Sequence, residues 1–344
     1  MQTKWIRILL NLGLLLLLAF SSASTVLAQS DTQVRITQVD NSKFPTVTLY
    51  VSVTNSAGEP VGVDPATVQI AENGQAMKIV DARGGGQGGQ GVAEPLTTML
   101  VLDISGSMDK NNKLTAAKDA AKAYVNQMRA GDQAGLMTFD TQTYYVQPVT
   151  TDTVALTSAI DGLKTGGDTS MFDALVEAEN NLSSISGRKA VIALTDGLDN
   201  HSQNTVDNVI EQIGPSGLTI STVGFGDAGT ASQSGLDEGA LKSLAERSGG
   251  LYSFASDSES LSALYQQFGR TLQSEYAITY VSPSTLRDGI NRNLTVSLSD
   301  IGVITETNYN PGGVLPEVTG TSWTLFGVIL GGLLLLLLVP FVIS

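Results

Sequence analysis

The chain has 344 residues, with 33 Asp and Glu against 19 Lys and Arg, a net charge of −14 and no cysteine. This acidic excess argues against binding nucleic acid or anionic lipid through bulk electrostatics. The absence of cysteine excludes disulfides, thiolate metal sites and cysteine nucleophiles, so the fold must rest on a packed core.

The first 28 residues have the pattern of a secretory signal peptide. Lys4 and Arg7 form a basic start, residues 8–20 form an apolar core, and Val26-Leu27-Ala28 offers small residues for cleavage before Gln29. A retained N-terminal anchor is the alternative. The pattern predicts that residues 1–28 are removed and that the rest of the chain is exported.

Residues 29–83 contain short runs in which apolar and polar residues alternate. The clearest run spans residues 47–53, and turn residues such as Asn73-Gly74 separate one run from the next. This pattern predicts one face of a small antiparallel sheet. The glycine-rich segment that follows, residues 84–94, is typical of a flexible linker.

From residue 95 to residue 274, buried-type strands alternate with helical patterns. The expected strands are residues 99–102, 134–139, 190–194 and 218–223, and the expected helices are residues 114–128, 154–163, 171–182, 206–213, 239–247 and 258–272. Continuous apolar runs separated by crossover helices are typical of strands that are buried on both faces. The segment therefore predicts an α/β domain built on a doubly wound, mostly parallel sheet.

Within residues 275–309, the stretch 275–298 returns to strand-like alternation, with apolar residues in every second position around Ile278 and Val296 and a turn near Gly289. A lone hairpin of this size is not stable in water. We therefore infer that it joins residues 29–83 in one flanking antiparallel β-sandwich, with the α/β domain inserted between the two parts. The other arrangement is a separate hairpin packed on the α/β domain.

The C-terminal part begins with a Pro- and Gly-rich spacer, residues 310–321, and continues with residues 322–343, which carry no charge. At about 1.5 Å per residue, this apolar run matches a hydrocarbon core of about 30 Å. It predicts a transmembrane helix, and hence a single-pass protein of the cell membrane whose ectodomain lies outside the cytoplasm. Residues 315–320 resemble a cell-wall sorting signal with one residue too many, so retention in the membrane is favoured.

Oxygen-rich loops occur at three places in the α/β segment. They are Asp103-Ile104-Ser105-Gly106-Ser107, Gly166-Gly167-Asp168-Thr169 and Thr195-Asp196-Gly197. The carboxyl ends of parallel strands meet at one edge of a sheet, where such loops lie close together. Two carboxylates and three hydroxyls, without imidazole or thiolate, suit a hard cation such as Mg²⁺ or Mn²⁺. The predicted ligands are Asp103, Ser105, Ser107, Thr169 and Asp196.

At these residues the chain resembles the von Willebrand factor type A family and its metal-ion-dependent adhesion site, with bacterial membrane-anchored members as the nearest type. The three motifs match the family's three metal-binding loops in order. The resemblance implies that Ser105, Ser107 and Thr169 contact the metal when ligand is bound, while Asp103 and Asp196 act largely through water. It also implies that a protein partner supplies an Asp or Glu carboxylate to complete the metal's shell.

Two other signals point to different chemistry. Residues 224–229 fit the dinucleotide fingerprint, but a polar loop follows them instead of a helix, so no nucleotide is expected. His201 is the only histidine and lies near Asp196 and Asp199. A solvated loop position is favoured for it over a metal-binding or catalytic role.

Together these features predict a divalent-cation-dependent protein-binding module at the cell surface, and not an enzyme. An accessory or assembly subunit of a membrane complex is the first alternative. A metal-assisted hydrolase is the second, and it is disfavoured because no carboxylate beyond the ligands is clearly placed as a general base. The resemblance also implies a possible switch, since in some members the last helix, here residues 258–272, shifts when a carboxylate binds.

Overall fold

The computed structural model describes residues 32–84, 94–213, 217–226, 235–299 and 302–313, together with residues 326, 328 and 330. The expected signal peptide, residues 1–28, lies outside the described residues. So do most of the expected linker (84–94), spacer (310–321) and transmembrane helix (322–343). In the part of the chain that is described, no helix is long and apolar enough to cross a membrane.

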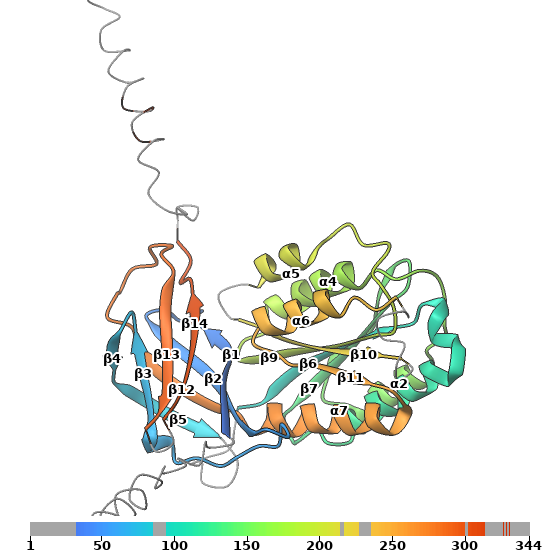
Figure 1. Cartoon of the computed structure of the whole chain (residues 1–344), viewed down its shortest axis with the longest axis horizontal. Coiled ribbons are helices and arrows are strands. Elements are labelled where there is room, and N and C mark those ends of the chain that lie inside the picture. The colour runs from blue at the N-terminus through green and yellow to red at the C-terminus, as the bar shows by residue number, and fades with distance from the viewer. Residues whose placement is uncertain are drawn as a thin grey trace, which may run out of the picture. The chain divides into compact units, whose positions relative to one another are not determined.

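Within the described residues, a six-stranded sheet in the order β11-β10-β9-β6-β7-β8 forms the centre of the α/β domain (Figure 1). Its strands are β6 (Leu96–Asp103), β7 (Gln133–Phe139), β8 (Thr143–Thr150), β9 (Arg188–Thr195), β10 (Thr219–Phe225) and β11 (Tyr252–Ala255). Neighbouring strands run parallel except for β7 and β8, which are antiparallel. The mostly parallel sheet expected from the sequence is therefore confirmed.

The two edge strands of this sheet, β8 and β11, were not expected from the sequence. β8 exposes several of its side chains, among them Tyr144, Tyr145 and Val146, and β11 has only four residues. Neither strand contains the continuous apolar run that marks a strand buried on both faces. Both pair with strands that the sequence pattern did predict: β8 pairs with β7, and β11 pairs with β10.

Helices cover both faces of the six-stranded sheet. They are α2 (Lys113–Val125), α3 (Thr153–Asp161), α4 (Met171–Ser183), α5 (Val206–Gln212), α6 (Glu238–Arg247) and α7 (Ser258–Gln273). Side chains of α2, α3 and α7 share one buried cluster with the sheet, and side chains of α4, α5 and α6 share another. The domain is therefore doubly wound, as the crossover pattern predicted.

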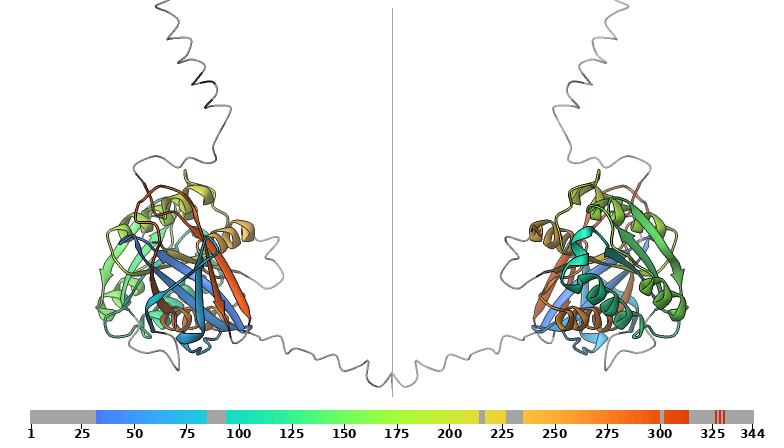
Figure 2. Two further views of the ribbon diagram at one scale, coloured as in Figure 1. Left: turned by 90° about the vertical axis from the view of Figure 1, so that its left-hand side faces the viewer. Right: turned by 90° about the vertical axis from the view of Figure 1, so that its right-hand side faces the viewer.

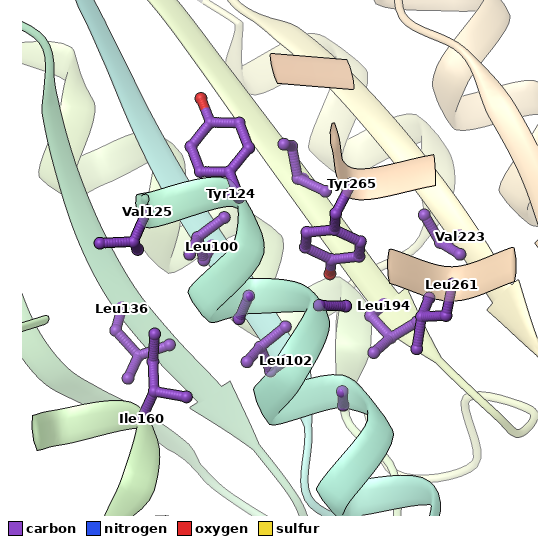
Figure 3. Close-up of a cluster of buried hydrophobic side chains, with 14 of the residues drawn as sticks. Leu100, Leu102, Tyr124, Val125, Leu136, Ile160, Leu194, Val223, Leu261 and Tyr265 are labelled. Carbon is purple, nitrogen blue, oxygen red and sulfur yellow. The ribbon is translucent and has the colours of Figure 1, made fainter. Parts of the chain in front are cut away.

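Consecutive residues of the central strand β6 enter opposite clusters. Met99 and Val101 pack on the α4 side, whereas Leu100 and Leu102 pack on the side of α2 and α7. Figure 3 shows this second cluster, with Leu100 and Leu102 among the side chains of both helices. Because both faces are buried, residues 99–102 of this strand are all apolar, and each buried Leu stabilises the fold by about 1.5–3 kcal/mol.

The remaining strands form two four-stranded sheets in the described part of the chain, with the orders β1-β2-β12-β5 and β14-β13-β3-β4. The strands are β1 (Thr32–Asp40), β2 (Thr46–Asn55), β3 (Val68–Glu72), β4 (Gln75–Met77), β5 (Ile79–Gly84), β12 (Tyr276–Val281), β13 (Arg292–Leu298) and β14 (Val303–Tyr309). Short 3₁₀ turns are η1 (Pro65–Thr67), before β3, and η2 (Gly106–Asn112), before α2. Apolar side chains of both sheets share one core, which makes the pair a β-sandwich (Figure 2, left).

The register shows how the chain enters and leaves this sandwich. Tyr276 of β12 pairs with Val51 on one side and Gly84 on the other, so β12 lies between β2 and β5. Leu294 of β13 pairs with Glu72 of β3. Strands after the α/β domain therefore do pair with strands before it, as inferred, and the separate hairpin is wrong.

Three details of the sandwich differ from the sequence-based expectation. β12 and β13 belong to different sheets, so they form no hairpin with each other. The strands of residues 29–83 are divided between the two sheets instead of forming one face. β14 lies inside the segment 275–309 that was assigned to the sandwich, but it was not predicted as a separate strand. The alternation of apolar and polar residues indicates that a strand has one buried face, but it does not specify which neighbouring strand it pairs with.

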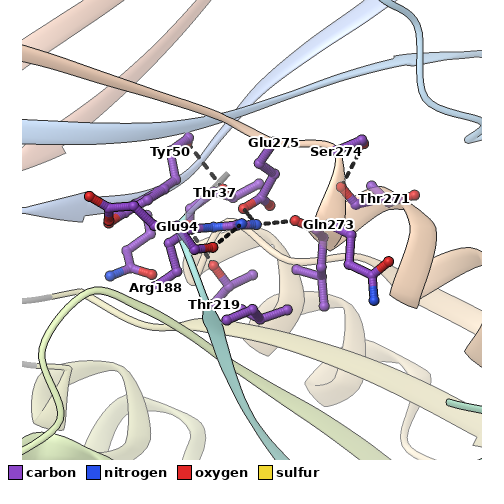
Figure 4. Close-up of polar contacts among 12 residues, drawn as sticks. Thr37, Tyr50, Glu94, Arg188, Thr219, Thr271, Gln273, Ser274 and Glu275 are labelled. Carbon is purple, nitrogen blue, oxygen red and sulfur yellow. Dashed lines mark hydrogen bonds and ion pairs between the residues drawn. The ribbon is translucent and has the colours of Figure 1, made fainter. Parts of the chain in front are cut away.

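A buried arginine joins the α/β domain to the sandwich (Figure 4). Arg188, at the start of β9, donates a hydrogen bond to Glu275 Oε2 at 2.8 Å, just before β12, and another to the carbonyl of Leu272 at the end of α7. Its guanidinium also lies 5.5 Å from the ring centre of Tyr50 on β2. Tyr50 in turn donates to Glu94. The end of α7 and the first residue before β12 are thus held against the base of the sheet.

Candidate metal centre

Asp103 ends the central strand β6, and its side chain is buried. Its carboxylate accepts hydrogen bonds from the Ser105 backbone N–H at 2.7 Å and from Thr195 Oγ1 at 2.6 Å. Burial raises the pKa of Asp103 to about 6, and the hydrogen bonds from Ser105 and Thr195 oppose that shift by favouring the ionised form. The first predicted ligand is therefore held rigidly by groups on two neighbouring strand ends.

A chain of hydrogen bonds connects three further predicted ligands. The hydroxyls of Ser105 and Ser107 lie 3.0 Å apart, and Ser107 Oγ donates to Asp196 Oδ1 at 2.5 Å. Asp196 follows directly after β9, the neighbour of β6 in the sheet. The shared edge of two parallel strands therefore brings together side chains that are far apart in the sequence.

The loop that carries Thr169 is tied to the first loop through the backbone. Gly106 N–H donates to Gly167 O at 3.0 Å, and Gly166 N–H donates to Ile104 O at 2.7 Å. Thr169 is buried, and its Oγ1 lies 3.8 Å from the position that a Cβ would take at Gly197. Thr169 is therefore beside the Asp196 loop, and all five predicted ligands lie at one edge of the sheet.

Two glycines of this second loop have no room for a side chain. A Cβ at Gly166 would collide with the carboxylate of Asp140, and one at Gly167 with the hydroxyl of Thr141. Both contacts come from the loop that follows β7. The paired glycines of the motif are thus required by close packing, which allows the Thr169 loop to approach the end of β6.

The donor set fits a hard divalent cation. The described residues contain no group of three or more His, Cys, Asp and Glu side chains that could hold a metal. The site instead combines two carboxylates with hydroxyl oxygens, which is the chemistry that Mg²⁺ and Mn²⁺ accept. His201 is exposed, and its backbone N–H donates to Thr169 O at 3.1 Å. The expectation of a solvated loop histidine agrees with this placement.

Three residues at the site were given no role in the sequence analysis. Thr195 orients Asp103, Asn200 accepts a hydrogen bond from Thr169 N–H at 3.1 Å, and Lys113 Nζ lies 2.6 Å from Asp196 Oδ2. Thr195 and Asn200 lie within five residues of Asp196 and could have been suspected from their position. The approach of Lys113 depends on how η2 leads into α2, which no local spacing indicates.

Comparison with known proteins identifies the domain that holds these residues. Residues 98–198 match the von Willebrand factor type A domain family. This segment is a von Willebrand factor type A domain. The matched range contains all five predicted ligands, the whole of β9 and β6 from residue 98 onward.

Relatives of the von Willebrand factor type A segment include proteins of very different length. Calcium-activated chloride channel regulator 1 of the horse, Equus caballus, is 30% identical over 241 residues, which cover 64% of this chain and 25% of that protein. A UPF0353 protein of Mycolicibacterium paratuberculosis is 28% identical over 203 residues, covering 52% of this chain and 60% of that protein. The chain therefore spans about a quarter of the first relative's length and three-fifths of the second's.

Solved structures with a similar arrangement also include von Willebrand factor type A proteins. A von Willebrand factor type A protein from Catenulispora acidiphila is 16% identical with a TM-score of 0.48, covering 86% of this chain and 76% of that one. The conserved hypothetical protein BatB from Bacteroides thetaiotaomicron is 19% identical with a TM-score of 0.43, covering 52% of this chain and all of that one.

Proposed function

We propose that this protein is a divalent-cation-dependent protein-binding module. The observation that carries the proposal is the convergence of three oxygen-rich loops at one edge of the sheet. Hydroxyls and carboxylates of the first and third loops lie 2.5–3.0 Å apart, and backbone hydrogen bonds join the Thr169 loop to the first. Asp103, Ser105, Ser107, Thr169 and Asp196 would hold Mg²⁺ or Mn²⁺. When bound, the cation supplies a fixed positive charge on an otherwise acidic protein.

The partner is a protein that presents an Asp or Glu side chain. The family resemblance implies that such a carboxylate completes the cation's shell. The acidic surface of this protein would otherwise repel a partner carboxylate. The bound cation attracts that carboxylate, so the contact is favourable only at the cation site. We propose that the site binds and does not catalyse, because the carboxylates of Asp103 and Asp196 are each engaged by donors within the protein.

We further propose that the module is displayed outside the cytoplasm on a single-pass membrane anchor. This part of the proposal rests on the signal-like residues 1–28 and the uncharged residues 322–343. It gives the binding site access to partners outside the cell or in the same membrane.

An accessory subunit of a membrane complex is the second candidate function. The observation that favours it is the likeness to proteins named chloride channel regulators, although the chain spans only a quarter of their length. Affinity purification of the full chain from membranes, in Mg²⁺ and again in EDTA, separates the two candidates. Co-purification of one integral membrane protein in both conditions would favour the accessory role.

The cation site is tested by the thermal stability of the protein with and without Mg²⁺. A ligand that binds only the folded state stabilises it by about 2.7 kcal/mol at a hundred times its Kd, which raises Tm by a few degrees. We expect this rise in the wild-type protein and its loss in Asp103→Ala and the near-isosteric Asp103→Asn.

Asp168→Ala is the matched control, because Asp168 is an exposed carboxylate in the same motif as Thr169 but is not a predicted ligand. It should keep the full Mg²⁺-induced rise in Tm. An unchanged Tm of the wild-type protein on addition of Mg²⁺ or Mn²⁺ would refute the proposed function.

A further inference from the structure

Lys113 places a positive charge on one of the predicted metal ligands. Its Nζ lies 2.6 Å from Asp196 Oδ2, and the pair is largely withdrawn from solvent, with the Lys113 side chain 15% exposed and that of Asp196 fully buried. The other oxygen of Asp196 accepts the Ser107 hydroxyl at 2.5 Å. Both oxygens of this carboxylate are thus occupied by donors from the protein itself.

The backbone before α2 delivers Lys113 to this position. Lys113 is the first residue of α2, and the two residues before it, Asn111 and Asn112, both have left-handed backbone angles, with φ of 53° and 56°. Residues other than glycine rarely adopt these backbone angles, and asparagine is among those that tolerate them best. Two consecutive left-handed residues turn the chain sharply from η2 into α2, so the ammonium is held at the metal site by the fold.

We propose that Lys113 is an internal competitor for the cation, an ammonium that neutralises Asp196 when no metal is bound and that lowers the affinity of the site. This inference rests on the proposed function. Asp103 and Asp196 give the ligand set two negative charges, and Lys113 cancels one of them. A divalent cation at these ligands lies within a few ångströms of the ammonium, and the two repel each other strongly in a partly buried site.

The structure also provides a place to which the ammonium can withdraw. A cavity of about 360 Å³ lies beside Lys113 and is lined by Phe225, Ser256 and Asp257 as well. Asp257, whose carboxylate accepts hydrogen bonds from Ser260 and Ser256 at the start of α7, brings a second negative charge to the lining of that cavity. Rotation of the flexible lysine side chain would move the ammonium away from Asp196 into this cavity while α2 stays in place.

The test is the affinity for Mn²⁺ alone, measured by electron paramagnetic resonance or calorimetry on the full chain. We expect Lys113→Met to bind Mn²⁺ about tenfold more tightly than the wild-type protein at the same ionic strength, because one repelling charge has been removed. Lys113→Arg keeps the charge and should stay close to the wild type.

Lys110→Met is the matched control. Lys110 is exposed, lies in the same connecting segment and contributes the same charge, so its replacement changes the net charge equally. It should alter the Mn²⁺ affinity less than twofold. Lys113→Gln, which keeps a donor for Asp196 without the charge, replaces Lys113→Met if the latter does not fold.

The outcomes for this inference and for the proposed function are distinguishable. Equal Mn²⁺ affinity in Lys113→Met and Lys110→Met, or weaker binding in Lys113→Met, overturns the competitor role while wild-type binding still supports the cation site. Binding by Lys113→Met but not by the wild type would support the competitor role and, at the same time, refute cation-dependent binding as the function of the wild-type protein. Failure of every variant to bind Mn²⁺ overturns the proposed function and this inference together.

Discussion

At the scale of single residues, Glu179 is a carboxyl group in an unusual setting. It lies on the buried side of α4 and is 5% exposed. Neither of its carboxyl oxygens has a hydrogen-bond partner in the described part of the chain. Burial alone raises the pKa of Glu179 to about 8. The side chain is therefore neutral in the folded protein at pH 7.

This raised pKa predicts a loss of stability as the pH rises. Between the ordinary pKa of a glutamate and about 8, the unfolded chain has released the proton of Glu179 while the folded protein still holds it. The Glu179 contribution is thus fully favourable below the ordinary pKa and is lost as the pH approaches 8, by up to about 1.4 kcal/mol per pH unit. Glu179→Gln should remove this contribution from the pH dependence.

The measurement is the free energy of unfolding in urea at intervals from pH 5 to pH 9. The free energy of unfolding of Glu179→Gln should increase relative to that of the wild type as the pH rises. Glu177 is exposed on the same helix. The free energy of unfolding of Glu177→Gln should therefore vary with pH as that of the wild type does. Parallel curves for all three proteins would contradict a neutral Glu179.

At the scale of helices, α2 and α7 pack against the same face of the sheet and each buries one tyrosine (Figure 3). Tyr124 on α2 forms a hydrogen bond of 2.5 Å with the hydroxyl of Thr98 on β6. Tyr265 on α7 is equally buried, but its hydroxyl has no hydrogen-bond partner among the described residues. The two rings contribute similar apolar area, so their hydroxyls are what distinguishes them.

This difference predicts opposite effects of the same substitution. Tyr265→Phe removes an unsatisfied buried hydroxyl and should raise the free energy of unfolding by about 1 kcal/mol. Tyr124→Phe removes a satisfied hydroxyl and leaves Thr98 unpaired, so it should lower the free energy by about 1 kcal/mol. Urea denaturation of both variants checks the pair, and a loss of stability in Tyr265→Phe would show that its hydroxyl is satisfied.

The C-terminal half of helix α7 also contacts the sandwich, at the loop that follows β2. Gln267 donates to Ala57 O at 2.7 Å, and Thr271 Oγ1 donates to Gly58 O at 3.2 Å. Arg270 forms an ion pair with Glu59 at 3.0 Å. The helix shift that the family resemblance implies remains a proposal for this protein. Such a shift would have to break or move these contacts, so it would directly affect the sandwich loop at residues 57–59.

At the scale of the whole molecule, the buried pair of Arg188 and Glu275 links the two parts of the fold. Their side chains are 1% and 4% exposed. Desolvation raises the pKa of Glu275, and the nearby Arg188 guanidinium opposes the shift. Removing one member of a buried pair leaves the other charge without compensation, which is more damaging than the loss of the attraction itself.

Arg188→Met should therefore lower the free energy of unfolding by about 3–5 kcal/mol. The double variant Arg188→Met/Glu275→Gln should recover part of that loss, since no buried charge is left alone. Arg247→Met provides the comparison, because Arg247 pairs with Asp207 at the surface, where removal changes stability by less than about 1 kcal/mol. A loss as small in Arg188→Met as in Arg247→Met would show that the buried pair is unimportant.

Much of the α/β domain and of its site follows from the sequence alone. Residues 99–102 of β6 and residues 190–194 of β9 are apolar without a break because both faces of each strand are buried, so their pattern is plain without a structure. Oxygen-rich loops follow both strands directly. Parallel strands bring their carboxyl ends to one edge, which is why Asp103 and Asp196 could be placed together from their positions.

Only the tertiary structure decided how the sandwich strands pair and which charged side chain contacts the candidate metal site. Alternation along β12 and β13 indicates one buried face, but strands with that pattern can pair with several neighbours, and the actual pairing separates these two into different sheets. Lys113 and Asp196 are 83 residues apart, and their contact depends on the left-handed turn before α2. Local patterns record which faces are buried, whereas long-range pairings and ion pairs arise only when the packed core brings distant segments together.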